Sequence, residues 1–152
     1  MSGEKQEPGY CILIADDDMD DQYMIKQAFS SINLNENVHT VNDGVELLDY
    51  LNRRGKYKDA NILIPKVILL DLNMPKKDGR ECLKEIKTNP RFNKIPIVIY
   101  STSSNPDDIS YAYENGASSY ITKPYSYQEL VKIMDTFKQY WFNIVKTTHT
   151  II

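Results

Sequence analysis

The sequence predicts an α/β domain in which a five-stranded parallel sheet is doubly wound, with helices on both faces. Two observations support this prediction. Short apolar runs alternate along the chain with stretches whose apolar residues recur at helical spacing, and an acid, a hydroxyl or a lysine directly follows four of the apolar runs. Strands that alternate with helices favour parallel pairing, and a (βα)5 chain of this kind is expected to have the strand order 2-1-3-4-5.

Length and composition are those of one globular domain. The chain has 152 residues, of which 41% are hydrophobic and 26% are charged, which suffices for a single core. A net charge of −3 and a pI near 5.4 argue against nucleic-acid binding. No apolar run approaches the roughly 20 residues that span a bilayer, and the polar residues 1–9 predict a short disordered arm rather than a signal peptide. We therefore expect a cytoplasmic protein with protein partners and no membrane contact.

The first half of the chain provides two strands and two helices. The apolar run Tyr10–Ala15 predicts a buried strand, and five acids occupy the six positions after it. Apolar residues at i, i+3, i+4 and i+7 then predict a helix with Asp18 as its N-cap. A weaker strand, Val38–Val41, precedes a helix that begins with a capping box of Asp43 and Glu46. The expected inner face of this second helix consists of Val45, Leu48 and Leu51.

The middle of the chain is organised around the stretch V-I-L-L-D-L-N-M-P-K-K-D-G. Its four apolar residues predict a third strand, buried on both faces, that ends at Asp71. A helix with Cys82, Leu83 and Ile86 on its inner face follows. The fourth strand is expected at Ile95–Tyr100, directly before Ser101.

The last third of the chain completes the alternation. Asn105 as N-cap and a proline at the next position predict a helix, whose inward residues are expected to be Ile109, Ala112 and Tyr113. The fifth strand, Ser118–Thr122, leads directly into Lys123 and Pro124. A capping box that starts at Ser126 opens the final helix. With this element the pattern is that of a flavodoxin-like sheet.

Side chains at the carboxyl ends of the strands predict a phosphoryl-transfer site. In the order 2-1-3-4-5 the first and third strands are neighbours, so Asp16 and Asp17 would face Asp71 across the crevice where such folds bind ligands. Each close carboxylate pair costs on the order of 4 kcal/mol at an effective dielectric of 20, which a hard divalent cation relieves. Mg²⁺ suits such carboxylates together with a backbone carbonyl, for which Asn73 is placed.

The same edge of the sheet would supply the other groups that phosphoryl transfer needs. A carboxylate beside Mg²⁺ and a lysine can act as a nucleophile and form an aspartyl-phosphate, which makes Asp71 the candidate acceptor. Lys123 would neutralise charge on the phosphoryl oxygens, and Ser101 could donate a hydrogen bond to one of them.

On these residues the chain resembles the receiver domains of two-component response regulators. The matching residues are the pair Asp16-Asp17, D-L-N-M-P-x-x-D-G from Asp71 to Gly79, Ser101, G-A-S-S-Y from Gly116 to Tyr120, and Lys123-Pro124. The resemblance covers roughly residues 10–140. It implies that Asp71 accepts a phosphoryl group from a sensor histidine kinase and that Asp16, Asp17 and the Asn73 carbonyl hold Mg²⁺.

The resemblance also implies a switch and a narrower group of relatives. Lys123 would pair with the phosphoryl group, Ser101 and Tyr120 would relay the change, and the Lys123–Pro124 peptide bond would be cis. Within the family the chain is similar to the single-domain regulators that partner bacterial phytochromes. The similarity lies in D-L-N-M-P-K-K-D-G-R-E, a longer loop before the third strand, and aromatic residues late in the last helix.

The expected output is association with another protein. The receiver domain would span residues 10–147 and leave a short tail, 148–152, too small for an output domain. A last helix over Tyr127–Lys146 would be about 30 Å long and would overhang the sheet. Aromatic residues are favoured at interface cores, so we expect a homodimer through this helix as well as a downstream protein target. A simple core role for these aromatic residues is the alternative interpretation of the helix. The predicted interface residues are Tyr140, Trp141, Phe142 and Val145.

Two alternatives stay open at this point. Asp16-x-Asp18 after an apolar strand also resembles the start of a haloacid-dehalogenase-type phosphatase, in which Asp16 would be the nucleophile and Asp71 incidental. A degenerate receiver that binds partners without phosphorylation is the other alternative, and it is disfavoured because every acceptor-site side chain is present.

Overall fold

The sheet has the predicted composition and order. The computed structural model describes residues 9–34, 37–59 and 61–148, so most of the expected arm and tail lies outside the described residues. Its five strands pair in parallel in the order β2-β1-β3-β4-β5. Their bounds are β1 Tyr10–Ala15, β2 Val38–Val41, β3 Ile64–Leu70, β4 Ile97–Ser101 and β5 Ser119–Thr122.

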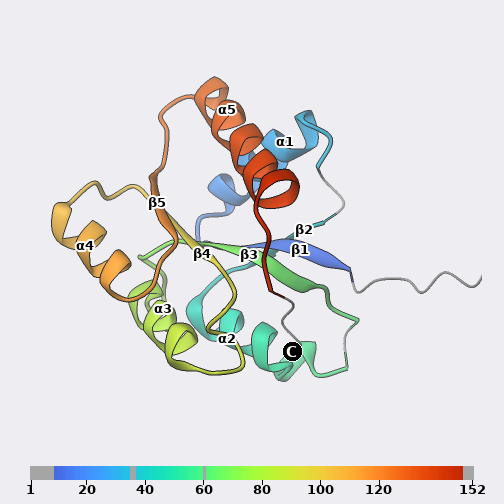
Figure 1. Ribbon diagram of the computed structural model, residues 1–152, viewed down its shortest axis with the longest axis vertical. Helices are drawn as coiled ribbons and strands as arrows, with labels where there is room; N and C mark the ends of the chain where they lie inside the picture. Colours follow the sequence, from blue (N-terminus) through green and yellow to red (C-terminus); the bar gives the residue numbers. More distant parts are fainter. Residues whose placement is uncertain (1–8, 35–36, 60, 149–152) are drawn as a thin grey trace, which may run out of the picture.

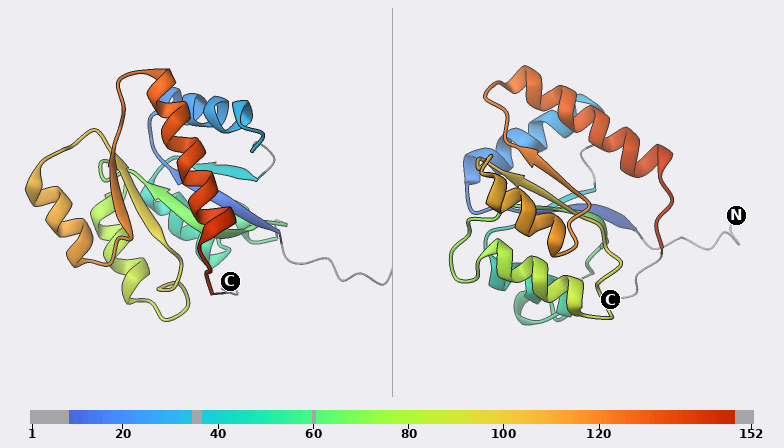
Figure 2. Two further views of the ribbon diagram at one scale, coloured as in Figure 1. Left: turned by 45° about the horizontal axis from the view of Figure 1, so that its top comes forward. Right: turned by 60° about the vertical axis from the view of Figure 1, so that its left-hand side comes forward.

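Helices cover both faces of this sheet (Figure 1). α1 (Met19–Ser31) and α5 (Tyr127–Lys138) lie together on one face, as both views of Figure 2 show. On the other face lie α2 (Gly44–Asn52), α3 (Gly79–Thr88) and α4 (Pro106–Glu114). A short 3-10 helix, η1 (Gly55–Tyr57), follows α2, and a π-helical segment, η2 (Gln139–Ile144), continues α5. The architecture is therefore the doubly wound one.

The side chains of each central strand pack into two separate hydrophobic cores, one on each face of the sheet. In β1, Leu13 packs into the core beneath α2 and α3, whereas Ile12 and Ile14 pack into the core beneath α1 and α5. β3 repeats the pattern with Leu70 and Leu69. Because alternate side chains of a strand point to opposite faces, a continuous apolar run is what a strand covered on both faces requires. Full burial of each such side chain contributes about 1.5–3 kcal/mol.

The predicted helix caps are present at four helix starts. Side chains of Asp18, Asp43, Asn105 and Ser126 accept hydrogen bonds from amides in the first turns of α1, α2, α4 and α5. Each cap satisfies an amide that has no partner inside the helix. The positions of these helices therefore follow from local sequence.

Two inward-facing predictions are wrong. In α2, Val45 was expected to be buried but is 43% exposed, and Leu47 is buried instead. In α4, Tyr113 was expected to be buried but is 51% exposed, while its neighbour Ala112 is fully buried. In both helices the residue at the edge of the apolar face points to solvent. These helices are only nine residues long, so apolar spacing within them fixes the direction of the buried face poorly.

The last helix is shorter than predicted and its aromatic residues do not overhang the sheet. α5 ends at Lys138, and the π-helical segment ends at Ile144 rather than at Lys146. The Val145 amide donates to the Tyr140 carbonyl over 3.0 Å, five residues back. A turn of this width changes which side chains face the sheet.

Trp141 belongs to the core. It is 9% exposed and its ring lies 6.4 Å from that of Phe137, while Phe142 and Val145 are half-buried against the same cluster. Of the four predicted interface residues only Tyr140, 47% exposed, is open to solvent. Over residues 9–34, 37–59 and 61–148, no helix combines the length and apolar character needed to cross a membrane.

Candidate functional site

The site residues lie at the carboxyl ends of neighbouring strands: Ser101 is the last residue of β4, and the others directly follow a strand. The Asp71 amide donates to the Ala15 carbonyl over 2.9 Å, and the Lys123 amide donates to the Ser101 carbonyl over 2.8 Å. These bonds continue the strand ladders by one residue. The parallel sheet therefore fixes the backbones of Asp16, Asp71, Ser101 and Lys123 at one edge, as the sequence predicted.

Lys123 lies at the centre of an acidic cluster. Its Nζ donates to Asp71 Oδ2 over 3.0 Å, to Asp16 Oδ2 over 2.9 Å and to Asp21 Oδ2 over 2.7 Å. The side chains of Lys123, Asp16 and Asp71 are almost completely buried. A partly desolvated ion cluster of this kind is stable only when every charge has a partner.

Burial and pairing shift the pKa values of two of these groups. Burial raises the pKa of Asp16 to about 6, although Lys123 and the Asp18 amide act in the opposite direction. Burial alone would lower the pKa of Lys123, but its hydrogen bonds to Asp21 and Asp16 outweigh burial and raise it. At neutral pH Lys123 is therefore an ammonium and Asp16 a carboxylate.

Three of the carboxylates fit a divalent cation. One oxygen each from Asp16, Asp17 and Asp71 lies within 4.8 Å of the other two. Asp17 is exposed, whereas Asp16 and Asp71 are buried, so the cluster opens to water on one side. A set of hard oxygen donors with access to water is what Mg²⁺ and similar ions prefer.

The loop after Asp71 is tightly built. Leu72 and Met74 are buried and anchor it, and the Gly79 amide donates to the Leu72 carbonyl over 2.9 Å. The Asn73 amide donates to Asp71 Oδ1 over 3.2 Å, which orients the candidate acceptor. The backbone carbonyl of Asn73 remains a predicted metal ligand.

Ser101 and Tyr120, the predicted relay residues, meet at Ser103. The Ser103 amide donates to the buried Ser101 Oγ over 3.1 Å, and the Tyr120 hydroxyl donates to the Ser103 carbonyl over 2.8 Å. Ser103 Oγ in turn donates to Asp108 Oδ2 over 2.6 Å. The half-buried Tyr120 ring packs against the core beneath α2 and α3, so it already points inward.

Arg80 extends this network back to the acceptor loop. Its Nη2 donates to Asp108 Oδ1 over 2.8 Å, and its Nη1 lies 3.3 Å from Asn73 Oδ1 and 3.3 Å from Asp78 Oδ2. Sequence reasoning missed Arg80, Ser103 and Asp108, as it missed the contact of Asp21 with Lys123. The only sequence signal for any of these contacts was the acidic first turn of α1, which contains Asp21.

The predicted cis peptide bond is wrong. No peptide bond is cis within the part of the chain that the structure describes, so Lys123–Pro124 is trans. Trans is the lower-energy form of an X–Pro bond by about 0.5–1 kcal/mol. With the bond trans, the Lys123 side chain still reaches all three carboxylates.

Fold and site together define a signalling phosphoacceptor domain. Residues 12–135 match the response regulator receiver domain family, and the chain belongs to this family. It is 34% identical to response regulator Rcp1 of Synechocystis sp. over 145 residues, which cover 95% of this chain and 97% of Rcp1. It is also 34% identical to the probable methanogenesis regulatory protein FilR2 of Methanothrix harundinacea, covering 91% of this chain and 86% of FilR2.

Solved structures agree with this assignment. The phosphorylated cyanobacterial phytochrome response regulator RcpA is 37% identical, with a TM-score of 0.84, and the match covers 94% of this chain and all of RcpA. The Mn²⁺-bound form of Rcp1 is 34% identical, with a TM-score of 0.83, and the match covers 93% of this chain and all of that chain. The flavodoxin-like prediction and the resemblance to phytochrome response regulators are confirmed.

Proposed function

We propose that Asp71 accepts a phosphoryl group from a sensor histidine kinase in a Mg²⁺-dependent reaction, and that the phosphorylated chain signals by protein association. The observation that carries this proposal is the contact of Lys123 Nζ with Asp71 Oδ2 over 3.0 Å, beside the cluster of Asp16, Asp17 and Asp71. This places a cation and a candidate metal site next to one nucleophilic carboxylate.

Each side chain has a role in the transfer. A carboxylate oxygen of Asp71 forms a bond to phosphorus as the bond between phosphorus and the donor histidine nitrogen breaks. Lys123 stabilises negative charge on the phosphoryl oxygens. Ser101 Oγ accepts from the Ser103 amide and keeps its own proton for donation to a phosphoryl oxygen, since a hydroxyl can do both. Mg²⁺, held by Asp16, Asp17, Asp71 and the Asn73 carbonyl, would supply further charge neutralisation.

Exposed apolar side chains on α1 and directly after Pro124 suit contact with the kinase. Met19 and Tyr23 on α1 are both more than 60% exposed, and Tyr125 is fully exposed. Tyr125 also lines a hollow that reaches Lys123 and Asp21. Aromatic and methionine side chains are favoured at interface cores, and a phytochrome-type kinase is proposed because RcpA is a phytochrome response regulator.

A labelling experiment tests the acceptor. With acetyl phosphate and Mg²⁺, the wild-type chain and Asp16→Asn should form an acyl phosphate, although Asp16→Asn more slowly, whereas Asp71→Asn should not. Label that survives in Asp71→Asn and disappears in Asp16→Asn would support the haloacid-dehalogenase alternative instead. Tyr23→Ala should keep acetyl phosphate labelling but lose phosphotransfer from the cognate kinase; unimpaired phosphotransfer would remove α1 from the kinase surface.

The relay that we propose runs from Ser101 to Tyr120 through Ser103. A phosphoryl group on Asp71 would draw the Ser101 hydroxyl towards it, and the Ser103 backbone would follow because its amide is bonded to Ser101. Tyr120 would then be held more firmly in its inward position. Ser101→Ala should abolish the change in hydrogen exchange of residues 102–108 on phosphorylation; an unchanged response would contradict the relay.

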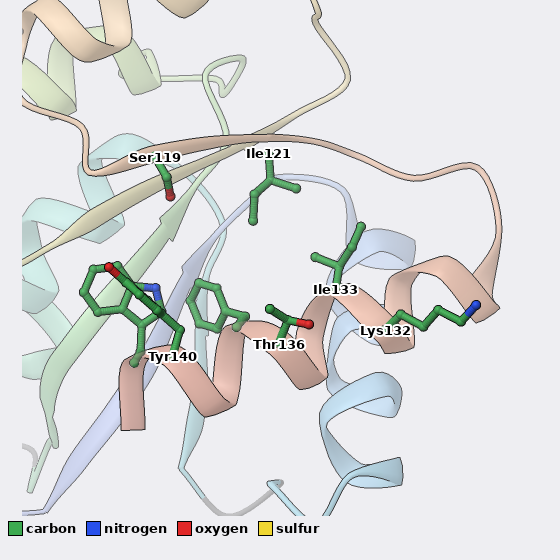
Figure 3. Close-up of a pocket in the computed structure, with 8 residues that line it drawn as sticks. Ser119, Ile121, Lys132, Ile133, Thr136 and Tyr140 are labelled. Carbon is green, nitrogen blue, oxygen red and sulfur yellow. The ribbon is translucent and has the colours of Figure 1, made fainter. Parts of the chain in front are cut away.

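We also propose that the chain forms a homodimer through its last helix. A groove of about 400 Å³ lies between the edge strand β5 and α5, lined by Ile121, Ile133 and Phe137; Figure 3 shows Ile121 on the strand side and Ile133 on the helix side. Tyr140 stands at one end of the groove, and Ile144 is 65% exposed one turn beyond it. An apolar groove beside exposed apolar side chains is typical of a self-complementary surface.

A further inference from the structure

All three N–H groups of the Lys123 ammonium already donate a hydrogen bond. It carries three N–H groups, and three carboxylates accept from it: Asp16, Asp21 and Asp71. The contact with Asp21 is the shortest of the three, at 2.7 Å. A phosphoryl oxygen that is to accept a hydrogen bond from Lys123 must therefore replace one of these carboxylates.

The three carboxylates differ in how easily they can be replaced. Asp16 is 1% exposed, and its second oxygen accepts from the Asp18 amide over 2.9 Å, so it is held on both sides. Asp71 is the acceptor itself and stays in place. Asp21 lies in the first turn of α1 with its side chain 34% exposed, and among the described residues only Lys123 bonds to its carboxylate. Asp21 is therefore the carboxylate that can turn away into solvent.

We propose that Asp21 is a positioning residue that competes with the phosphoryl group for Lys123 and thereby sets the rate of phosphorylation and the lifetime of the acyl phosphate. This inference rests on the proposed function of Asp71. With acetyl phosphate as donor, an Asp71 oxygen bonds to phosphorus and the bond from phosphorus to acetate breaks, releasing acetate. Asp21 and Lys123 form no covalent bond, and Lys123 keeps its protons throughout.

The direction of the effect follows from the competition. While Asp21 holds Lys123, part of the positive charge that would stabilise the transferring phosphoryl group is already neutralised. Removal of the Asp21 charge should release Lys123 to the phosphoryl oxygens, speed phosphorylation and slow loss of the label. Because the Asp21 side of this ion pair is one-third exposed, an effect of about two- to fivefold is expected on each rate.

The neighbouring acid provides a matched control. Asp20 is exposed in the same turn of α1, and within the described residues its carboxylate accepts no hydrogen bond and makes no ion pair. Asp20→Asn therefore removes the same charge close to the site without touching Lys123. Asp21→Glu keeps the negative charge on a longer side chain. Asp21→Ser removes the charge as Asp21→Asn does, but with a smaller side chain.

The experiment measures the rate of acyl phosphate formation from acetyl phosphate with Mg²⁺, and the decay of the label after acetyl phosphate is removed. We expect Asp21→Asn and Asp21→Ser to gain label faster and lose it more slowly than the wild type, Asp20→Asn to match the wild type, and Asp21→Glu to restore wild-type rates. Equal effects of Asp20→Asn and Asp21→Asn, or slower labelling of Asp21→Asn, would overturn the inference.

Failure of this inference is distinguishable from failure of the proposed function. Absence of label in the wild type, or label that persists in Asp71→Asn, would contradict the acceptor role of Asp71. Loss of label in Asp71→Asn together with identical kinetics of Asp20→Asn and Asp21→Asn would leave the acceptor in place and remove only the role of Asp21.

Discussion

At the scale of single residues, Gly79 keeps the acceptor loop closed. A Cβ atom at this position would lie 2.0 Å from the Asp71 carbonyl oxygen and 2.8 Å from Leu72 Cα. Both atoms belong to the backbone, so no side chain can move aside to make room. The loop can therefore fold back against the start of α3 only because residue 79 has no side chain.

Gly79→Ala should destabilise the fold by roughly 1–3 kcal/mol, as overpacking of a closed site does. It should also slow labelling of Asp71, because the new methyl group displaces the acceptor's own carbonyl. Urea denaturation and acetyl phosphate labelling measure the two effects. Gly9→Ala is the control, since its Cβ would meet only the flexible end of Leu63. Equal stability of the two variants would mean that the loop can open at little cost.

The residues of the site divide by how they could be found from sequence. Asp16, Asp71 and Lys123 each follow a strand and Ser101 ends one, so topology alone brings them to one end of the sheet. Asp21 is different, because its contact with Lys123 depends on the direction in which a side chain leaves the first turn of α1. That direction is set by tertiary packing, which periodicity does not encode.

At the scale of elements, an ionic contact ties the start of α3 to α4. Arg80 and Asp108 are both less than one-third exposed and lie 2.8 Å apart. Asp108 also accepts from Ser103 Oγ, so the pair holds the loop on which Ser101 acts. A hydrogen bond from Ser103, and then Arg80, lower the pKa of Asp108. The stabilisation from the Arg80–Asp108 ion pair is therefore fully present above the pKa of Asp108 in the unfolded chain, about 4. It is lost as the pH falls through the lower pKa of Asp108 in the folded chain.

A double-mutant cycle with Arg80→Ala and Asp108→Ala should give a coupling free energy of about 0.5–1 kcal/mol at pH 7. The pair Arg80→Ala and Asp107→Ala should show no coupling, since Asp107 has no ion pair among the described residues. Chemical denaturation of each variant provides the values. Additive effects of Arg80→Ala and Asp108→Ala would show that α3 and α4 are not joined through this contact.

The last helix makes a separate prediction about assembly. Because Trp141 is part of the core, its removal would test folding, whereas Tyr140 and Ile144 are exposed at the proposed interface. Tyr140→Ser combined with Ile144→Ser should shift the chain towards monomer in sedimentation velocity. Tyr113→Ser on α4, where the side chain is similarly exposed, should leave the mass unchanged. A wild-type monomer at all concentrations would contradict the proposed dimer.

The elements themselves were largely predictable, and the exceptions have physical causes. β1 and β2 have the predicted bounds because each apolar run stops at polar residues. The π-helical segment was not foreseen, since a widened turn leaves no repeat in the sequence. Consequently the orientation of the final aromatic residues was the least predictable feature of the fold.

At the scale of the whole molecule, the site opposes folding through its own charge. Three carboxylates, those of Asp16, Asp21 and Asp71, surround the ammonium of Lys123, and the carboxylate of Asp17 lies close to those of Asp16 and Asp71. In an unfolded chain Asp71 lies far from the other acids and all of them are in water, and folding brings them together in a partly desolvated crevice. Close like charges lower the stability of the folded state, so a cation that binds only this arrangement should raise it.

The proposed Mg²⁺ site therefore predicts a thermal shift. A ligand at ten times its Kd stabilises the folded state by about 1.4 kcal/mol, which for a domain of this size raises the Tm by roughly 3–6 °C. Asp17→Asn should remove most of the shift, because Asp17 is a predicted ligand with no ion pair among the described residues. Asp20→Asn should retain it. Calorimetry with and without MgCl₂, at constant ionic strength, separates specific binding from screening. An equal shift in both variants would mean that Mg²⁺ acts on general charge and not at this site.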